Sequence, residues 1–194
     1  MTIGREFRLI VRHRPDVRRL REDLIGLAGG FTEIEAGGRL RFILCLAGRD
    51  AKQRVLELVE AWKTRGVVVS LEDQERAPDR DEVYFLLPLQ RNPDLAGGPR
   101  GPLFTNEDLA GIRTELARRF SFRPEMVRVY GEWRNAAGEL VPDVSFLIRV
   151  PRRGRGTTPS LRRFLREHIL ANPRCDQDCL YLSNRWRGEY VYPV

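Results

Sequence analysis

The order in which strand-like and helix-like patterns follow one another is the feature that most constrains this fold. Residues 6–13 alternate apolar and polar side chains, which is the pattern of a half-buried strand. The patterns that follow are a helix, a hairpin, a second helix and a β-branched strand, at residues 15–30, 31–47, 49–66 and 67–72. The first part of the chain therefore predicts the element order βαββαβ.

The same order returns after the charged, proline-containing segment 75–81, which predicts a linker. Its patterns are a strand, a helix, a hairpin, a helix and a strand, at residues 83–89, 105–120, 126–150, 158–170 and 179–183. We therefore expect an α+β protein of two tandem ferredoxin-like units, residues 1–74 and 82–194, each an antiparallel sheet with both helices on one face. The second unit carries expanded loops and a C-terminal tail.

The strands expected at the centre of each sheet are apolar on both sides. In the strand at 83–89, for example, Tyr84 and Leu86 alternate with residues that are also apolar. An antiparallel sheet with one face in water should instead alternate apolar with polar residues. We therefore expect the two faces without helices to cover each other, or a second chain to cover them.

Short motifs in the second unit are VYFLLPLQRN, LARRF, YGEWRNAAGE and CDQDCLYL. Through them, residues 82–183 resemble a group of small, single-domain bacterial proteins of unknown function. The resemblance implies a ferredoxin-like fold and no activity. In architecture alone, tandem units with a basic loop are also similar to CRISPR RNA-processing endonucleases, which carry a glycine-rich loop near the C-terminus and often a catalytic histidine. The glycines here, Gly154 and Gly156, precede the last predicted helix, which departs from the usual placement in that family.

The distribution of positive charge suggests an anionic partner. The net charge is +7, and the segment 149–166 contains seven arginines and no acid. A second expanded loop, 91–104, follows the first strand of the same unit, and we expect both loops to leave the same end of its sheet. The candidate anion-binding or nucleic-acid-binding residues are Arg91, Arg100, Arg149, Arg152, Arg153, Arg155, Arg162, Arg163 and Arg166. A solvated loop in an arginine-rich chain is the alternative interpretation.

Three further residues are candidates for function. Trp133 and Trp186 could stack nucleic-acid bases, or they could pack in the core or at an interface. His168, on the last predicted helix near the arginines, is a weak catalytic candidate as a general base; the alternative is a structural role. Cys175 and Cys179 lack the further ligands that a structural zinc site needs, so we expect no metal, and no sequence motif indicates a cofactor.

These patterns favour a non-enzymatic binding protein that contacts RNA, DNA or another polyanion through the arginine-rich loop. One alternative is a structural or regulatory module that pairs with a protein partner or a second copy through its sheets. Others are a small-molecule sensor of the ACT type, with its site at the junction between the units, and a metal-independent RNase. The sequence leaves enzymatic activity open. It has no apolar run of membrane-spanning length and no secretory signal pattern, so we expect a cytoplasmic protein without a membrane partner.

Overall fold

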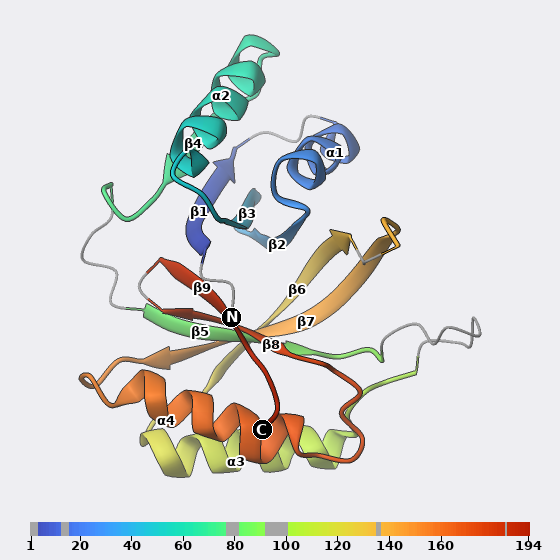
Figure 1. Cartoon of the computed structure of the whole chain (residues 1–194), viewed down its shortest axis with the longest axis vertical. Helices are drawn as coiled ribbons and strands as arrows, with labels where there is room; N and C mark the ends of the chain where they lie inside the picture. Colours follow the sequence, from blue (N-terminus) through green and yellow to red (C-terminus); the bar gives the residue numbers. More distant parts are fainter. Residues whose placement is uncertain (1–3, 13–15, 77–81, 92–100, 135–136, 185) are drawn as a thin grey trace.

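The computed structural model describes residues 4–12, 16–76, 82–91, 101–134, 137–184 and 186–194 (Figure 1). The first half contains β1 (Gly4–Val11), α1 (Val17–Ala28), β2 (Gly30–Ala36), β3 (Arg39–Leu46), α2 (Ala51–Thr64) and β4 (Val69–Glu72). The second half contains β5 (Glu82–Pro88), α3 (Asn106–Phe120), β6 (Glu125–Arg134), β7 (Leu140–Pro151), α4 (Thr157–Phe164), the π-helical turn η1 (Leu165–Leu170), β8 (Leu180–Asn184) and β9 (Arg187–Val191). The predicted element order is present in both halves, and β9 is an additional strand.

The strands form one continuous sheet, so the prediction of two tandem ferredoxin-like sheets is wrong. The strand order is β3-β2-β6-β7-β5-β8-β9-β1-β4, and β1 also pairs with β3. This extra pairing closes eight strands into an antiparallel barrel. The remaining strand, β4, pairs with β1 only and is not part of the ring. The helices consequently lie outside the barrel in two pairs, α1 with α2 and α3 with α4, on opposite sides of it (Figure 1).

Two junctions join the halves. Residues 30–33 of β2 pair with residues 130–133 of β6. At the other junction Gly4 and Arg5 of β1 pair with Gly188 and Arg187 of β9. An open sheet leaves unpaired backbone N–H and C=O groups along its edge strands, and closing the sheet pairs these groups within the molecule. The free edges of two separate sheets are thus replaced by strand pairing between the halves.

The apolar residues divide into two outer cores and one inner core. Helices α1 and α2 cover one side of the barrel with a cluster that includes Phe7, Leu24, Phe42 and Trp62. Helices α3 and α4 cover the other side with a cluster that includes Phe85, Leu116, Phe164 and Leu182. The inner cluster contains residues of both halves, namely Ile34, Ile43, Tyr84, Val129 and Leu147. The faces without helices do cover each other, as their apolar patterns indicated, but they do so across the interior of a single closed sheet.

The junction between β1 and β9 requires residues without side chains. Gly4 and Gly188 face each other across this junction. A Cβ atom on Gly188 would lie 2.6 Å from the Cys45 Sγ atom and would also overlap the Tyr181 hydroxyl group. A Cβ atom on Gly4 would overlap the same sulfur atom. The glycine pair therefore lets the Cys45 and Tyr181 side chains pack directly over the junction.

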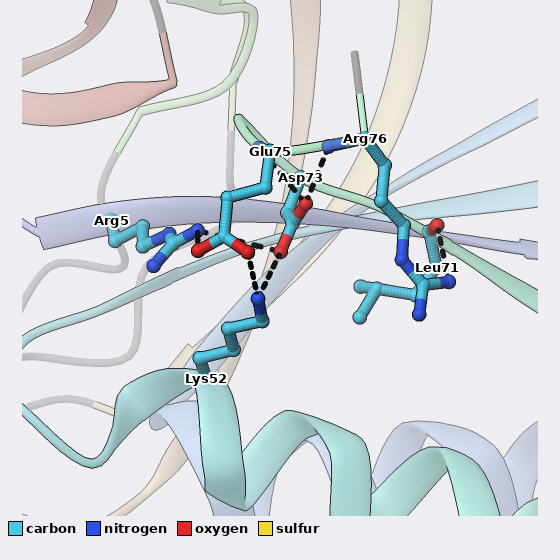
Figure 2. Close-up of polar contacts among 6 residues, drawn as sticks. All are labelled: Arg5, Lys52, Leu71, Asp73, Glu75 and Arg76. Carbon is cyan, nitrogen blue, oxygen red and sulfur yellow. Dashed lines mark hydrogen bonds and ion pairs between the residues drawn. The ribbon is translucent and has the colours of Figure 1, made fainter. Parts of the chain in front are cut away.

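A buried carboxylate, Asp73, fastens the end of β4 to β1 and α2 (Figure 2). It accepts hydrogen bonds from the backbone N–H groups of Glu75 at 3.1 Å and Arg76 at 3.0 Å. Its Oδ2 atom also lies 3.4 Å from the Arg5 guanidinium nitrogen and 3.9 Å from the Lys52 ammonium nitrogen. Asp73 thus lies beside two cations, which it shares with Glu75, and satisfies two backbone donors at the point where the chain leaves the first half.

We expect Asp73→Ala to lower the free energy of unfolding by about 2 kcal/mol, because it leaves buried donors without their acceptor. Urea denaturation followed by circular dichroism measures the change. Glu75→Ala is the matched control: Glu75 pairs with the same two cations, but its side chain is exposed. We expect that variant to unfold at nearly the wild-type urea concentration, and equal effects of the two substitutions would contradict the role given to Asp73.

Candidate ligand-binding site

A cavity of about 620 Å³ opens at one end of the barrel. The first half contributes the start of β2 and the end of β3, and the second half contributes the ends of β5, β6 and β9, the start of β7 and the segment before β8. The cavity therefore lies between the halves and exists only because the sheet closes.

Exposed aromatic side chains lie at the cavity wall. Trp133, Tyr190 and Tyr192 are 42%, 41% and 45% exposed, and all three line the cavity. Within the described ranges, no other tryptophan, tyrosine or phenylalanine side chain is classed as exposed. Large aromatic surface is normally buried unless it meets a ligand or partner. The exposed aromatic rings are thus concentrated at a single concave surface.

Polar groups from the interior face of β7 add to the same wall. Asp143 and Ser145 alternate with outward-facing residues, and the Ser145 hydroxyl donates a hydrogen bond to the Asp143 carboxylate at 2.8 Å. Ser145 is buried and Asp143 is partly buried. The thiol of Cys45 lies at the same surface, where burial, followed by the negative charge of Glu6, raises its pKa. The thiol is therefore protonated at neutral pH.

Tyr181 connects the cavity to a buried carboxylate deeper in the barrel. Its ring lines the cavity, and its hydroxyl donates to Glu6 Oε2 at 3.2 Å. The same oxygen accepts hydrogen bonds from the Tyr84 and Ser183 hydroxyls, each at 2.6 Å. The other oxygen, Oε1, accepts from Arg8 Nε at 2.8 Å. One fully buried carboxylate thus joins β1, β5 and β8.

The electrostatic environment keeps the two tyrosines as hydrogen-bond donors. Burial raises the pKa of Tyr84 and of Tyr181 well above the ordinary value, and the neighbouring Glu6 charge raises both further. On the opposite side of Glu6, Arg8 lies 4.4 Å from the centre of the Trp186 ring, a cation–π distance. The hydroxyls, the carboxylate and the guanidinium therefore have fixed complementary roles, and Tyr181 is held in one position.

The two expanded loops do not converge as predicted. β5 and β7 are antiparallel, with Glu82 opposite Pro151 and Pro88 opposite Ser145. The loop that follows β5 and the segment that follows β7 therefore leave opposite ends of the sheet. The expectation of a shared end is wrong because the hairpin of β6 and β7 reverses the direction of the chain. Arg91 lines the cavity, whereas the segment after β7 begins at the far end.

Many of the predicted anion-binding arginines contact oxygen atoms of the protein. Arg162 forms two hydrogen bonds with Glu189, at 2.6 and 3.0 Å. The other partners are Glu125 for Arg149, the Gly154 carbonyl for Arg152, the Ser121 carbonyl for Arg153 and the Tyr192 carbonyl for Arg166. Arg155 and Arg163 are exposed, and Arg100 lies outside the described residues. These positions do not test anion binding, which stays a prediction.

The remaining sequence candidates lie in three different environments. Trp133 is at the cavity, while Trp186 is buried against Arg8 inside the barrel. His168 is exposed on η1, where its ring stacks on Phe164 at 5.2 Å and contacts Arg119, away from the cavity. In the part of the chain that the structure describes, no three histidine, cysteine or acidic side chains are grouped to hold a metal ion.

Sequence reasoning missed Glu6, Asp143 and Tyr181. Each lies in a strand on the face opposite the outer core, and the sequence does not show which residues of that face meet inside a closed barrel. The alternation in WRGEYVY, residues 186–192, is a signal that could have revealed β9 and with it the inward positions of Tyr190 and Tyr192.

Comparisons with known proteins add little to these observations. No family model matches the chain, and no curated protein matches it. Among solved structures it is similar to the small subunit of acetolactate synthase from Thermotoga maritima, at 15% identity and a TM-score of 0.38, with the full length of both chains covered. A likeness at this level carries no argument about fold or function. Among the described helices, none has the length and hydrophobicity needed to cross a membrane.

Proposed function

We propose that this protein binds a small molecule in the cavity at the end of its barrel. The observation that carries the proposal is the gathering of exposed aromatic side chains, Trp133, Tyr190 and Tyr192, around one cavity of about 620 Å³. Ligand sites in proteins commonly measure about 300–1,000 Å³ and favour the mouths of β-barrels. This proposal keeps the site between the halves, as the small-molecule alternative from the sequence did, but places it inside a closed sheet.

The composition of the wall supports binding. Apolar and aromatic side chains provide contact area, and polar and charged residues, among them Asp143 and Ser145, border the same space. Such a combination is typical of sites that select a ligand by shape and fix its orientation by hydrogen bonds. The Tyr181 hydroxyl donates a hydrogen bond to the buried Glu6, so this side of the site is ordered before a ligand binds.

A thermal-shift screen of small polar, aromatic and charged metabolites tests this proposal. A ligand at about one hundred times its dissociation constant should raise the unfolding temperature by about 5–10 °C. Trp133→Ala should reduce the shift, because it removes an exposed part of the wall. Leu140→Ala, which truncates another exposed side chain that does not itself line the cavity, should leave the shift unchanged.

Two results would contradict small-molecule binding at this cavity. One is a screen in which no compound changes the unfolding temperature. The other is a ligand whose shift is the same in wild type, Trp133→Ala and Leu140→Ala, since such a ligand binds elsewhere.

Polyanion binding through the arginine-rich segment stays a separate proposal, supported by the exposure of Arg155 and Arg163. Fluorescence anisotropy with labelled RNA and DNA at about 50 mM salt tests it, because phosphate contacts are strong at low salt. We expect the affinity to fall steeply as the salt concentration rises. In the double variant Arg155→Ala/Arg163→Ala we expect the affinity to be lowered equally for all nucleic-acid sequences. Undetectable binding at low salt would remove the proposal.

A further inference from the structure

We propose that the ligand of this cavity carries a flat aromatic or heteroaromatic ring, which is held between Trp133 and the tyrosines of the opposite wall. The inference rests on the proposed function and names the chemical class of the ligand. Two features of the cavity carry it: the small residues that leave the space open, and the aromatic rings that face each other across that space.

The first feature is a layer of small residues above the inner core. Large aliphatic residues of that core fill the barrel interior on four strands, at Ile34, Ile43, Val129 and Leu147. Two positions nearer the cavity, on the same faces of the same strands, stand Thr32, Cys45, Gly131 and Ser145, and all four line the cavity. The large layer is therefore the floor of the cavity, and the small layer leaves the space above it open.

The second feature begins with three tyrosines at the β8–β9 hairpin. Tyr190 and Tyr192 flank Val191, which packs in the outer core, so strand alternation directs both rings to the interior. Tyr181 is the partner of Tyr190 across the two strands, and their ring centres lie 6.0 Å apart in an edge-to-face arrangement. Since the Tyr181 hydroxyl is also bonded to Glu6, this wall presents aromatic rings in fixed positions.

Trp133 stands on the wall opposite these tyrosines. It shares the inner face of β6 with Val129, whereas Tyr130 of the same strand packs against the outer core. Strands β6 and β9 are four places apart in the ring of eight, so Trp133 and Tyr190 face each other across the barrel. The interior of an eight-stranded barrel is filled by side chains or holds one small ligand. Rings that project from opposite walls therefore leave a narrow space, which suits a flat group.

The inference is independent of the charge of the ligand. Charged residues of both signs line the cavity, namely Arg91, Glu132, Arg134, Asp143 and Asp178. Contacts between aromatic rings need no net charge, and they contribute to binding beyond the burial of apolar surface. Uncharged compounds are therefore the appropriate probes, because they report on the rings and leave the charged side chains aside.

Isothermal titration calorimetry with two uncharged compounds tests the inference: 2-(2-naphthyl)ethanol, which is flat, and its fully saturated decahydro analogue, which is thicker and at least as apolar. A cavity that binds by hydrophobicity alone should favour the saturated compound, because that compound buries more apolar surface. We expect the naphthyl compound to bind wild type about tenfold more tightly, which corresponds to about 1.4 kcal/mol.

Substitutions that remove a ring should reduce this preference. Trp133→Leu and Tyr190→Leu each replace a ring by an apolar side chain without a flat face, so we expect either variant to lower the preference to about threefold or less. Tyr190→Phe is the matched control, because it keeps the ring and removes only the hydroxyl group. We expect this control to preserve the tenfold preference.

The outcomes separate this inference from the proposed function. Binding of the saturated compound as tightly as the naphthyl compound overturns the ring preference and leaves small-molecule binding intact. A tenfold preference that persists in Trp133→Leu overturns the assignment to opposed rings, and this variant decides alone if Tyr190→Leu fails to fold, because Trp133 is exposed.

If neither compound binds, the ligands found in the metabolite screen decide. Ligands that all carry an aromatic ring support the inference, whereas a ligand without one, such as a simple sugar, overturns it and leaves the proposed function intact. A screen without any ligand overturns both proposals.

Discussion

Glu6→Ala is expected to lower the free energy of unfolding by about 3–5 kcal/mol, because it removes one partner of a buried ion pair. Glu6 is fully buried, and its two oxygens accept hydrogen bonds from Arg8, Tyr84, Ser183 and Tyr181. After the substitution the three hydroxyls lose this acceptor, and the Arg8 guanidinium loses a counter-charge 2.8 Å away. The effect is large because β1 is also the strand on which the barrel closes.

Urea denaturation at neutral pH, followed by circular dichroism, measures this loss. Glu22→Ala is the control, because Glu22 forms an exposed pair with Arg18 on α1 and its removal should change stability by no more than about 0.5 kcal/mol. Glu6→Gln should lie between wild type and Glu6→Ala, since the amide keeps an acceptor oxygen but not the charge. A stability of Glu6→Ala within the range of the Glu22 control would contradict the role given to Glu6.

Trp62→Ala is expected to lower the free energy of unfolding by about 3–5 kcal/mol, as truncation of large buried aromatic side chains usually does. Trp62 is fully buried on α2, where the centre of its ring lies 6.2 Å from that of Phe42 in an edge-to-face arrangement. Its indole N–H also donates to the Asp23 carboxylate on α1 at 2.8 Å. The substitution therefore leaves a cavity between the helix pair and the sheet and removes a bond between the helices.

Trp133→Ala is the control, because it removes the same side chain from an exposed position at the cavity. Chemical denaturation of both variants should show a large loss for Trp62→Ala and a small one for Trp133→Ala. Equal losses would mean that Trp133 supports the fold, and the interpretation of its exposed ring as a binding surface would then fail.

The local elements could be predicted because their signals lie within a few neighbouring residues. Thr105 and Asp108 form the capping box that their spacing indicates, with reciprocal hydrogen bonds at the start of α3. Gly29 ends α1 in the left-handed conformation, and Gly37 and Gly38 turn the first hairpin with positive φ angles. Each of these features depends on residues close in sequence, so the order of strands and helices could be obtained without a structure.

The candidate site could be predicted only in fragments. Trp133 was named from the sequence, and it lines the cavity, although the expected role was base stacking. The arginine-rich segment drew attention by its composition, yet several of its side chains bind protein oxygens. Nothing in the neighbouring sequence distinguishes Asp143 and Tyr181 from polar residues on a solvent-exposed face of a sheet. Their importance depends on which residues lie across the barrel from them.

By itself, the sequence determined the alternation and helical periodicity that define two successive βαββαβ patterns, together with strands that are apolar on both sides. Only the tertiary structure decided how the sheet edges pair: β2 with β6, and β1 with β9. The physical reason is that strands pair through backbone groups, which hardly depend on the side chains. Open and closed sheets are therefore compatible with the same sequence pattern. Closure turned the faces without helices into an interior, and Glu6, Asp143 and the cavity acquired their positions from it.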